Sequence, residues 1–109
     1  MKLLRVGQSG QEKVAAIDSE FKIRDLSSYI DDLNPDTINF KTLEKLKKIK
    51  IETLPEISKN TRVGPCINRP SNILCIGLNY SLHAEQTGSK LPDNPIVFNK
   101  SPDCLQGPN

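Results

Sequence analysis

The sequence contains few aromatic and hydrophobic residues: no tryptophan, three phenylalanines, two tyrosines and 36% hydrophobic residues in a chain of 109. Any core is therefore small and mainly aliphatic. No run approaches the roughly 18 apolar residues of a membrane-spanning helix. Gly7 also interrupts the apolar stretch that starts at Met1 before a signal-peptide core can form. We therefore expect no membrane partner.

The sequence also lacks an excess of charge of either sign and any cysteine framework. Fifteen lysines and arginines against thirteen aspartates and glutamates give a net charge of +2, too close to neutral to indicate a nucleic-acid partner. Three cysteines, without a CxxC spacing, argue against disulfides and against a zinc site. We therefore expect a reducing, cytoplasmic compartment. Cys75 is interpreted as a buried small hydrophobe, because apolar burial raises the pKa of a thiol.

The first half of the chain predicts a small α+β unit. Apolar stretches at residues 2–6 and 13–17 and an alternating stretch at residues 21–26 predict an antiparallel meander of three strands. Asn39 is placed to cap a helix over residues 40–49. We expect this helix to pack on the meander through an apolar stripe, which consists of Phe40, Leu43, Leu46 and Ile49.

A loop-like segment separates this unit from the rest. Residues 54–70 are rich in breakers such as Gly64-Pro65, so we predict two domains, at residues 1–70 and 71–109. The lysines on the other face of the predicted helix favour a solvated surface over a phosphate or membrane site. Residues 101–109 have no core-forming pattern, and we expect the chain to be the opening part of a longer protein.

The second half is organised around Gly77, where an apolar run stops and a polar segment begins. Residues 73–76 predict a strand buried on both faces. Gly77 allows a sharp bend or a close approach to a ligand, because it has no Cβ. The polar segment at residues 80–86, which Gly88 can end, predicts a short helix. Residues 96–98 predict a further strand.

The succession of short motifs in this half resembles the opening of the main domain of the fumarylacetoacetate hydrolase family. The motifs are Ile73-Leu74-Cys75-Ile76-Gly77-Leu78-Asn79-Tyr80, His83-Ala84, Thr87-Gly88, Pro95-Ile96-Val97-Phe98-Asn99-Lys100 and Gly107-Pro108-Asn109. Residues 1–70 are similar, more loosely, to the small domain that precedes it in bacterial members such as ureidoglycolate lyases, diketo-acid hydrolases and hydroxyheptadienedioate isomerases. The resemblance implies that residues 71–109 are the truncated beginning of a mixed β-roll catalytic domain.

For function, the resemblance implies a metal-dependent enzyme. Members use Mg²⁺ or Mn²⁺ to bind a 2-oxo or 1,3-dicarbonyl acid by its oxygens, stabilise an enolate, and hydrolyse, isomerise or decarboxylate the acid. They commonly form homodimers. Their metal-binding carboxylates, a Glu-x-Glu pair and a later aspartate, would lie beyond the last residue of this chain. We therefore expect neither a metal ligand nor turnover in these 109 residues alone.

The resemblance gives His83 the role of a general base that activates water, paired in the family with a glutamate three positions later on a lid that closes over substrate. That position holds Gln86, which can orient the imidazole by a hydrogen bond but adds no negative charge. Glu85 lies one residue away, about 100° around a helix. Whether Gln86 or Glu85 partners His83 stays open. The glutamine at this position affects the activation of water, and therefore hydrolysis, more than it affects metal-dependent enolate chemistry.

The resemblance also implies a substrate-binding set. Lys100 matches a family lysine whose ammonium can meet a carboxylate or a developing oxyanion, and the alternative is a solvated lysine at a strand end. Gly77, Asn79 and Tyr80 are expected at the pocket edge, with Tyr80 equally placed to be a core residue beneath the lid. Two other functions stay open. One is a non-catalytic interaction domain, and the other is decarboxylation or tautomerisation of a 2-oxo acid on the same scaffold.

Overall fold

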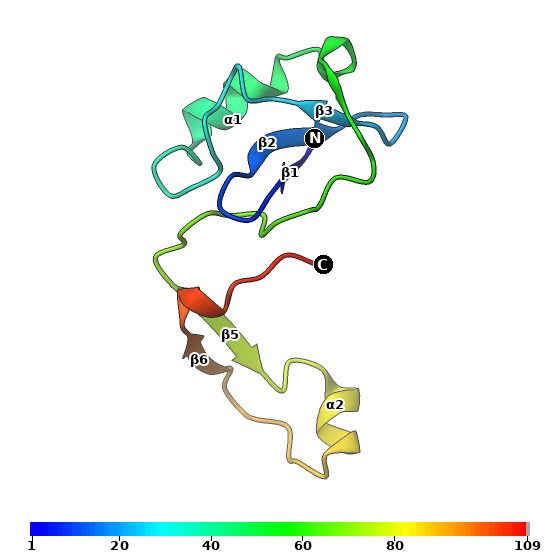
Figure 1. Ribbon diagram of the computed structural model, residues 1–109. Helices are drawn as coiled ribbons and strands as arrows, with labels where there is room; N and C mark the ends of the chain where they lie inside the picture. Colours follow the sequence, from blue (N-terminus) through cyan, green and yellow to red (C-terminus); the bar gives the residue numbers. More distant parts are fainter. Residues whose placement is uncertain (109) are drawn as a thin grey trace. The chain divides into compact units, whose positions relative to one another are not determined.

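The computed structural model describes residues 1–108 and divides into two compact units (Figure 1). Unit 1 comprises Met1–Pro70 together with the residues from Leu105 onward, and unit 2 comprises Ser71–Cys104. Unit 1 contains a four-stranded antiparallel sheet, and unit 2 contains a two-stranded one. The α+β class predicted from the sequence is confirmed. No helix among the described residues is both long enough and apolar enough to cross a membrane.

The sheet of unit 1 has neighbouring strands in chain order. The strands are β1 (Lys2–Val6), β2 (Lys13–Ile17), β3 (Ile23–Asp25) and β4 (Glu56–Ile57). β1 and β2 form the predicted hairpin, in which Leu4 lies opposite Ala15. This arrangement confirms the predicted meander and adds a strand at its edge.

The third strand is shorter than predicted. The backbone N–H groups of Glu20 and Lys22 both donate to the Asp18 carboxylate at 2.9 Å, which closes a turn where a strand was expected to begin. Phe21 in this turn has a φ of 63° and is 80% exposed. The prediction that the strand starts at residue 21 is therefore wrong. A side-chain-to-backbone turn competes here with the strand ladder.

β4 is absent from the sequence prediction, which treats residues 54–70 as loop. Its Ile57 lies opposite Ile23 of β3, and the Asp25 N–H donates to the Pro55 carbonyl at 2.9 Å. Two residues are too few to give an alternating pattern. The strand therefore depends on its tertiary neighbour rather than on local sequence.

The helix of unit 1, α1 (Phe40–Lys47), begins as predicted and ends two residues early. The Asn39 side chain accepts a hydrogen bond from the Thr42 N–H at 2.9 Å. The predicted apolar stripe is only partly correct, because Phe40 is 90% exposed and Leu46 is buried. Successive three-residue steps lag by about 60° each around an α-helix. Phe40 therefore lies on a different face from Leu46.

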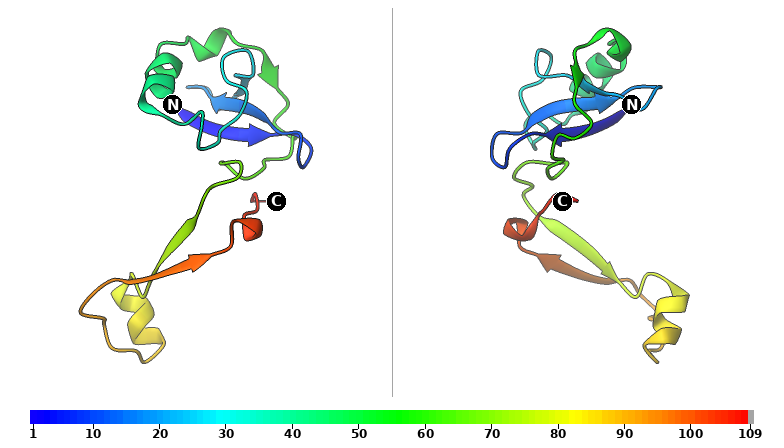
Figure 2. Two further views of the ribbon diagram at one scale, coloured as in Figure 1. Left: turned by 90° about the vertical axis from the view of Figure 1, so that its left-hand side faces the viewer. Right: turned by 45° about the vertical axis from the view of Figure 1, so that its right-hand side comes forward.

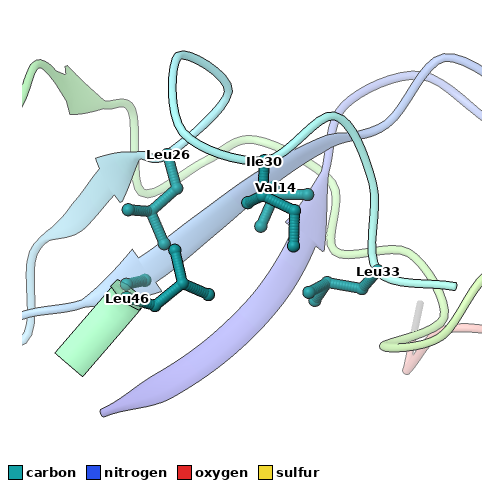
Figure 3. Packing of buried hydrophobic residues seen from close by; sticks show 6 residues of the cluster. Val14, Leu26, Ile30, Leu33 and Leu46 are labelled. Atoms are coloured by element: carbon teal, nitrogen blue, oxygen red, sulfur yellow. The ribbon is translucent and has the colours of Figure 1, made fainter. Parts of the chain in front are cut away.

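The main core of unit 1 lies between the sheet, α1 and the segment that follows β3 (Figure 3). The buried residues of this cluster are Val14, Ala16, Leu26, Ile30, Leu33 and Leu46. A second cluster, on the other face of the sheet, contains Leu4, Val6 and Ala15. Both faces of the four-stranded sheet are therefore covered.

Unit 2 is a hairpin with a short helix in its connection (Figure 2). The elements are β5 (Ile73–Gly77), α2 (Ser81–Gln86) and β6 (Ile96–Lys100). β5 and β6 are antiparallel. The prediction that residues 73–76 are buried on both faces is wrong for this structure, since Leu74 is 63% and Ile76 is 49% exposed. Within residues 71–104 the sheet has only two strands, and the face carrying these two side chains is open.

Candidate functional site

The turn between β5 and α2 is the most unusual backbone in unit 2. Gly77 still pairs with Ile96 as the last residue of β5, and a Cβ added to it would meet its neighbours at an ordinary 3.5 Å. The left-handed residue is Leu78, with a φ of 48°. The sharp bend expected at Gly77 therefore occurs one position later. A non-glycine residue in this region is strained and typical of functional turns.

α2 follows the strained turn and is held at both ends by backbone hydrogen bonds. The N–H groups of His83 and Ala84 donate to the Tyr80 carbonyl at 3.0 and 3.2 Å. At the other end Gly88, with a φ of 66°, donates to Glu85, and the next N–H, from Ser89, donates to Ala84. This is a Schellman motif. The prediction that Gly88 ends the helix is confirmed.

The polar side chains of α2 are exposed to solvent. Ala84 is 1% exposed, whereas His83, Glu85 and Gln86 are all exposed. Gln86 is three positions after His83 and shares its side of the helix, and Glu85 is two positions after it and does not. Among residues 1–108, neither side chain forms a hydrogen bond or an ion pair with the imidazole. The structure therefore joins His83 to neither residue, and the choice between Gln86 and Glu85 as its partner stays a prediction.

A surface hollow of about 440 Å³ lies beside the strained turn. Its lining residues come from the two ends of the connection: Ile76, Gly77, Leu78, Asn79, Leu91, Pro92, Asp93, Asn94 and Pro95. Gly77 and Asn79 therefore line the same hollow, and their role in substrate binding stays a prediction. Tyr80 and His83 do not line it, and Tyr80 is 72% exposed rather than part of a core.

Lys100 lies at the opposite end of the hairpin from this turn. It is the last residue of β6 and pairs with Ile73, whereas Gly77 pairs with Ile96. Four strand steps of about 3.3 Å separate the two ends by roughly 13 Å. Figure 2 shows α2 at the end where β5 stops and β6 begins. Within unit 2, Lys100 is therefore not brought next to Asn79 or His83.

The residues that sequence reasoning missed include Leu78 and the polar side chains of the second loop. Asp93 and Asn94 line the same hollow as Asn79. The signal for Leu78 was its place between a strand-ending glycine and a helix start. Asp93 and Asn94 had no local signal, because only the pairing of β5 with β6 brings their loop to this point.

A buried charge network in unit 1 was also missed. Arg5, which is 5% exposed, donates to both carboxylate oxygens of Asp32 at 2.6 and 3.3 Å, and to Glu12 at 3.3 Å. Glu12 also accepts from Arg62 at 2.9 Å, and Asp32 accepts from Asn68 at 2.7 Å. The sequence signal was an arginine within the apolar strand β1. The network ties β1 to residues 62–68.

The carboxyl groups of this network are held in their ionised form. Burial raises the pKa of Glu12, but the hydrogen bond from Arg62 and the charge of Arg5 outweigh it, so the pKa lies below its ordinary value. Burial likewise raises the pKa of Asp32, and the hydrogen bonds from Arg5 and Asn68 bring it below the ordinary value. Each charged side chain of the network forms its ion pairs with other members of the network. We therefore interpret this network as structural.

The cysteines and the acidic residues do not assemble a metal centre. Cys66 and Cys104 are exposed free thiols, and Cys75 is a free thiol that is half-buried rather than buried, because one face of its two-stranded sheet is only partly covered. Within the part of the chain that the structure describes, no three His, Cys, Asp or Glu residues gather into a group that could hold a metal ion.

Comparison with known proteins gives relatives over the entire chain. No family model matches the sequence. The chain is 43% identical over 109 residues to proteins named "Putative hydrolase" from Burkholderia ambifaria (strain MC40-6) and Burkholderia orbicola (strain MC0-3). A similarly named protein from Burkholderia lata is 42% identical over the same length. The chain spans only 39% of the length of each of these relatives. It is therefore similar to part of larger proteins that are named as hydrolases.

Proposed function

We propose that this chain forms part of a fumarylacetoacetate hydrolase-like enzyme that hydrolyses a C–C bond in a 2-oxo or 1,3-dicarbonyl acid. The observation that carries the proposal is the strained turn at Leu78. It presents Asn79 at a surface hollow and leads directly into a helix that exposes His83. The hydrolase names of the relatives favour hydrolysis over the isomerisation or decarboxylation that the resemblance also allows.

His83 is proposed as the general base that takes a proton from the attacking water. Its imidazole is exposed, so a ring nitrogen is available to water. Gln86, one helical turn further along the same side, would accept a hydrogen bond from the other ring nitrogen and fix the tautomer. Asn79 would donate its amide N–H to a carboxylate or carbonyl oxygen of a substrate in the hollow. Because Lys100 lies at the other end of its own hairpin, it would contribute only if the complete protein brings the Lys100 of another copy to this turn.

The Mg²⁺ or Mn²⁺ that the resemblance implies does not fit the residues present. Residues 1–108 offer no convergent group of metal-binding side chains, and Mg²⁺ needs several oxygen ligands around one point. We propose that any metal ligands belong to the part of the longer protein that this chain does not span. We also propose that the longer protein is a homodimer and is located in the cytoplasm.

The test uses a hybrid chain in which these 109 residues replace the matched part of the Burkholderia ambifaria (strain MC40-6) relative. We expect the hybrid to consume acylpyruvates, measured as loss of their enol absorbance. His83→Ala should lower kcat by about 10²- to 10⁴-fold with a much smaller change in KM. Ser81→Ala, on the same helix, is the matched control and should leave both constants unchanged.

A non-catalytic interaction domain is the second candidate. Gln86 favours it, because a glutamine replaces the carboxylate that the resemblance calls for beside His83. A folded hybrid without activity towards acylpyruvates, both with Gln86 and with Gln86→Glu, would contradict the enzymatic proposal and leave this candidate.

A further inference from the structure

The hairpin β5–β6 is apolar on both faces. Directly opposite residues of an antiparallel pair share a face. The face that we call the Leu74 face carries Leu74, Ile76 and Val97. The face that we call the Phe98 face carries Ile73, Cys75, Ile96 and Phe98. Leu74 and Val97 are 63% and 58% exposed, and Phe98 is 44% exposed. Both faces therefore leave large apolar side chains open to water.

The open apolar area is concentrated in this unit. Among residues 1–108, most of the exposed large hydrophobic side chains belong to unit 2: Leu74, Ile76, Tyr80, Leu82, Leu91, Ile96, Val97 and Phe98. In unit 1, by contrast, apolar clusters cover both faces of the sheet. An isolated two-stranded sheet is at best marginally stable in water. Contiguous exposed apolar surface marks a site of association.

We infer that both faces of the β5–β6 hairpin are a docking surface for the remaining part of the longer polypeptide represented by the Burkholderia relatives. Those relatives match this chain along its full length, yet the match accounts for only 39% of theirs. Most of their chain is therefore available to supply two covering layers. Lys100 is the only charged residue in the two strands, so the hairpin suits an apolar protein layer rather than a polar or charged partner.

The inference does not depend on the reaction catalysed, and its test measures protection and stability instead of activity. Amide exchange is compared at residues 73–77 and 96–100 in the 109-residue chain and in the hybrid chain described above. The chain alone should exchange rapidly at these positions, as expected for an uncovered two-stranded sheet. In the hybrid the same amides should exchange at least about tenfold more slowly, because a covered strand opens less often.

The second measurement compares the melting temperatures of the 109-residue chain and the hybrid when each carries the same substitution. Leu74→Lys should leave the melting temperature of the 109-residue chain unchanged, because the side chain is open there, and should lower that of the hybrid, because a lysine would be buried. Phe40→Lys is the matched control. Phe40 is 90% exposed and belongs to unit 1 rather than to the hairpin, so its substitution should be silent in both chains.

Three results would overturn the inference. The first is equal exchange of the hairpin in the two chains, and the second is equal tolerance of Leu74→Lys. The third is slow amide exchange of the hairpin in the 109-residue chain alone that becomes slower as the concentration rises, together with self-association in sedimentation experiments. That result would assign the surface to a second copy of the chain.

Discussion

Gly107 lies against the backbone of Gly64 in unit 1. A Cβ built on Gly107 would stand 2.9 Å from the Gly64 Cα and closer still to the Val63 carbonyl oxygen. On Gly64 itself, a Cβ would stand 2.9 Å from the Cγ of Glu12. Neither Gly64 nor Gly107 therefore has room for a Cβ, because the Glu12 side chain packs on Gly64 and Gly64 packs on Gly107. Residues 105–108, which follow unit 2 in the chain, pack in this way within unit 1.

We predict that Gly107→Ala releases residues 105–108 from unit 1. The displaced atoms are backbone, which cannot yield by changing rotamer, so the docked segment has to move. The NMR resonances of Val63 and Gly64 should shift, while the β1–β2 hairpin keeps its protection from exchange. Gly77→Ala is the matched control, because its new Cβ would make only ordinary contacts. Unchanged Val63 and Gly64 resonances in Gly107→Ala would refute the stacking.

A charge at Leu46 should unfold unit 1. Leu46 is 2% exposed within the main core, and burying an unpaired carboxylate costs several kcal/mol. Leu43→Asp, at a half-buried position, should cost less. Phe40→Asp on the same helix should be tolerated, because Phe40 is exposed. Thermal unfolding followed by circular dichroism measures all three. Equal melting temperatures for Leu46→Asp and the parent would exclude α1 from the core.

Removing the Arg5 guanidinium should lower the free energy of unfolding of unit 1. Arg5→Met leaves the carboxylates of Asp32 and Glu12 without their shared partner, and breaking a buried ion pair on one side costs about 3 kcal/mol. Lys47→Met is the matched control, because its ion pair with Glu44 is exposed and contributes less than about 1 kcal/mol. Urea unfolding gives both values. A loss no larger for Arg5→Met than for Lys47→Met would contradict this role.

The stability of unit 1 should fall in acid. The pKa values of Glu12, Asp18 and Asp32 are all lowered in the folded chain, in each case because hydrogen bonds and nearby cations outweigh the effect of burial. Such groups stabilise the fold above their ordinary values of about 4, and this stabilisation is lost as the pH falls through the folded-state pKa values.

The measurement for this prediction is the urea midpoint at about pH 7 and about pH 3. The midpoint should drop between them. In Asp32→Asn the drop should be smaller, because one of the titrating groups is gone. A midpoint that stays constant or rises on acidification would show that these carboxylates do not contribute as described.

We predict that residues 80–88 are mobile in the 109-residue chain and become ordered only in a complete protein with ligand. α2 spans six residues, fewer than the roughly 12 needed for a marginally stable isolated helix. Only Ala84 is buried, so the Schellman motif at Gly88 holds a helix with little packing. Amide exchange across residues 80–88 should be fast in the chain alone. Uniformly slow exchange there would rule out a lid.

The sequence by itself determined the elements whose signals are local. The hairpin of β1 and β2, the Asn39 cap, the start of α1 and the end of α2 at Gly88 follow from turn residues, a capping side chain and a left-handed glycine. The motif around Gly77 likewise located the candidate site, because a strand that stops at a glycine before a polar helix is visible in the chain itself.

Only the tertiary structure decided the features that depend on distant partners. β4 exists because β3 offers it an edge, and Arg5 is buried because Asp32 and Glu12 come from other segments to neutralise it. The register of β5 with β6 places Lys100 at the opposite end from Gly77. Apolar strands in the sequence predict burial, but whether a face is covered depends on which layers the folded chain supplies.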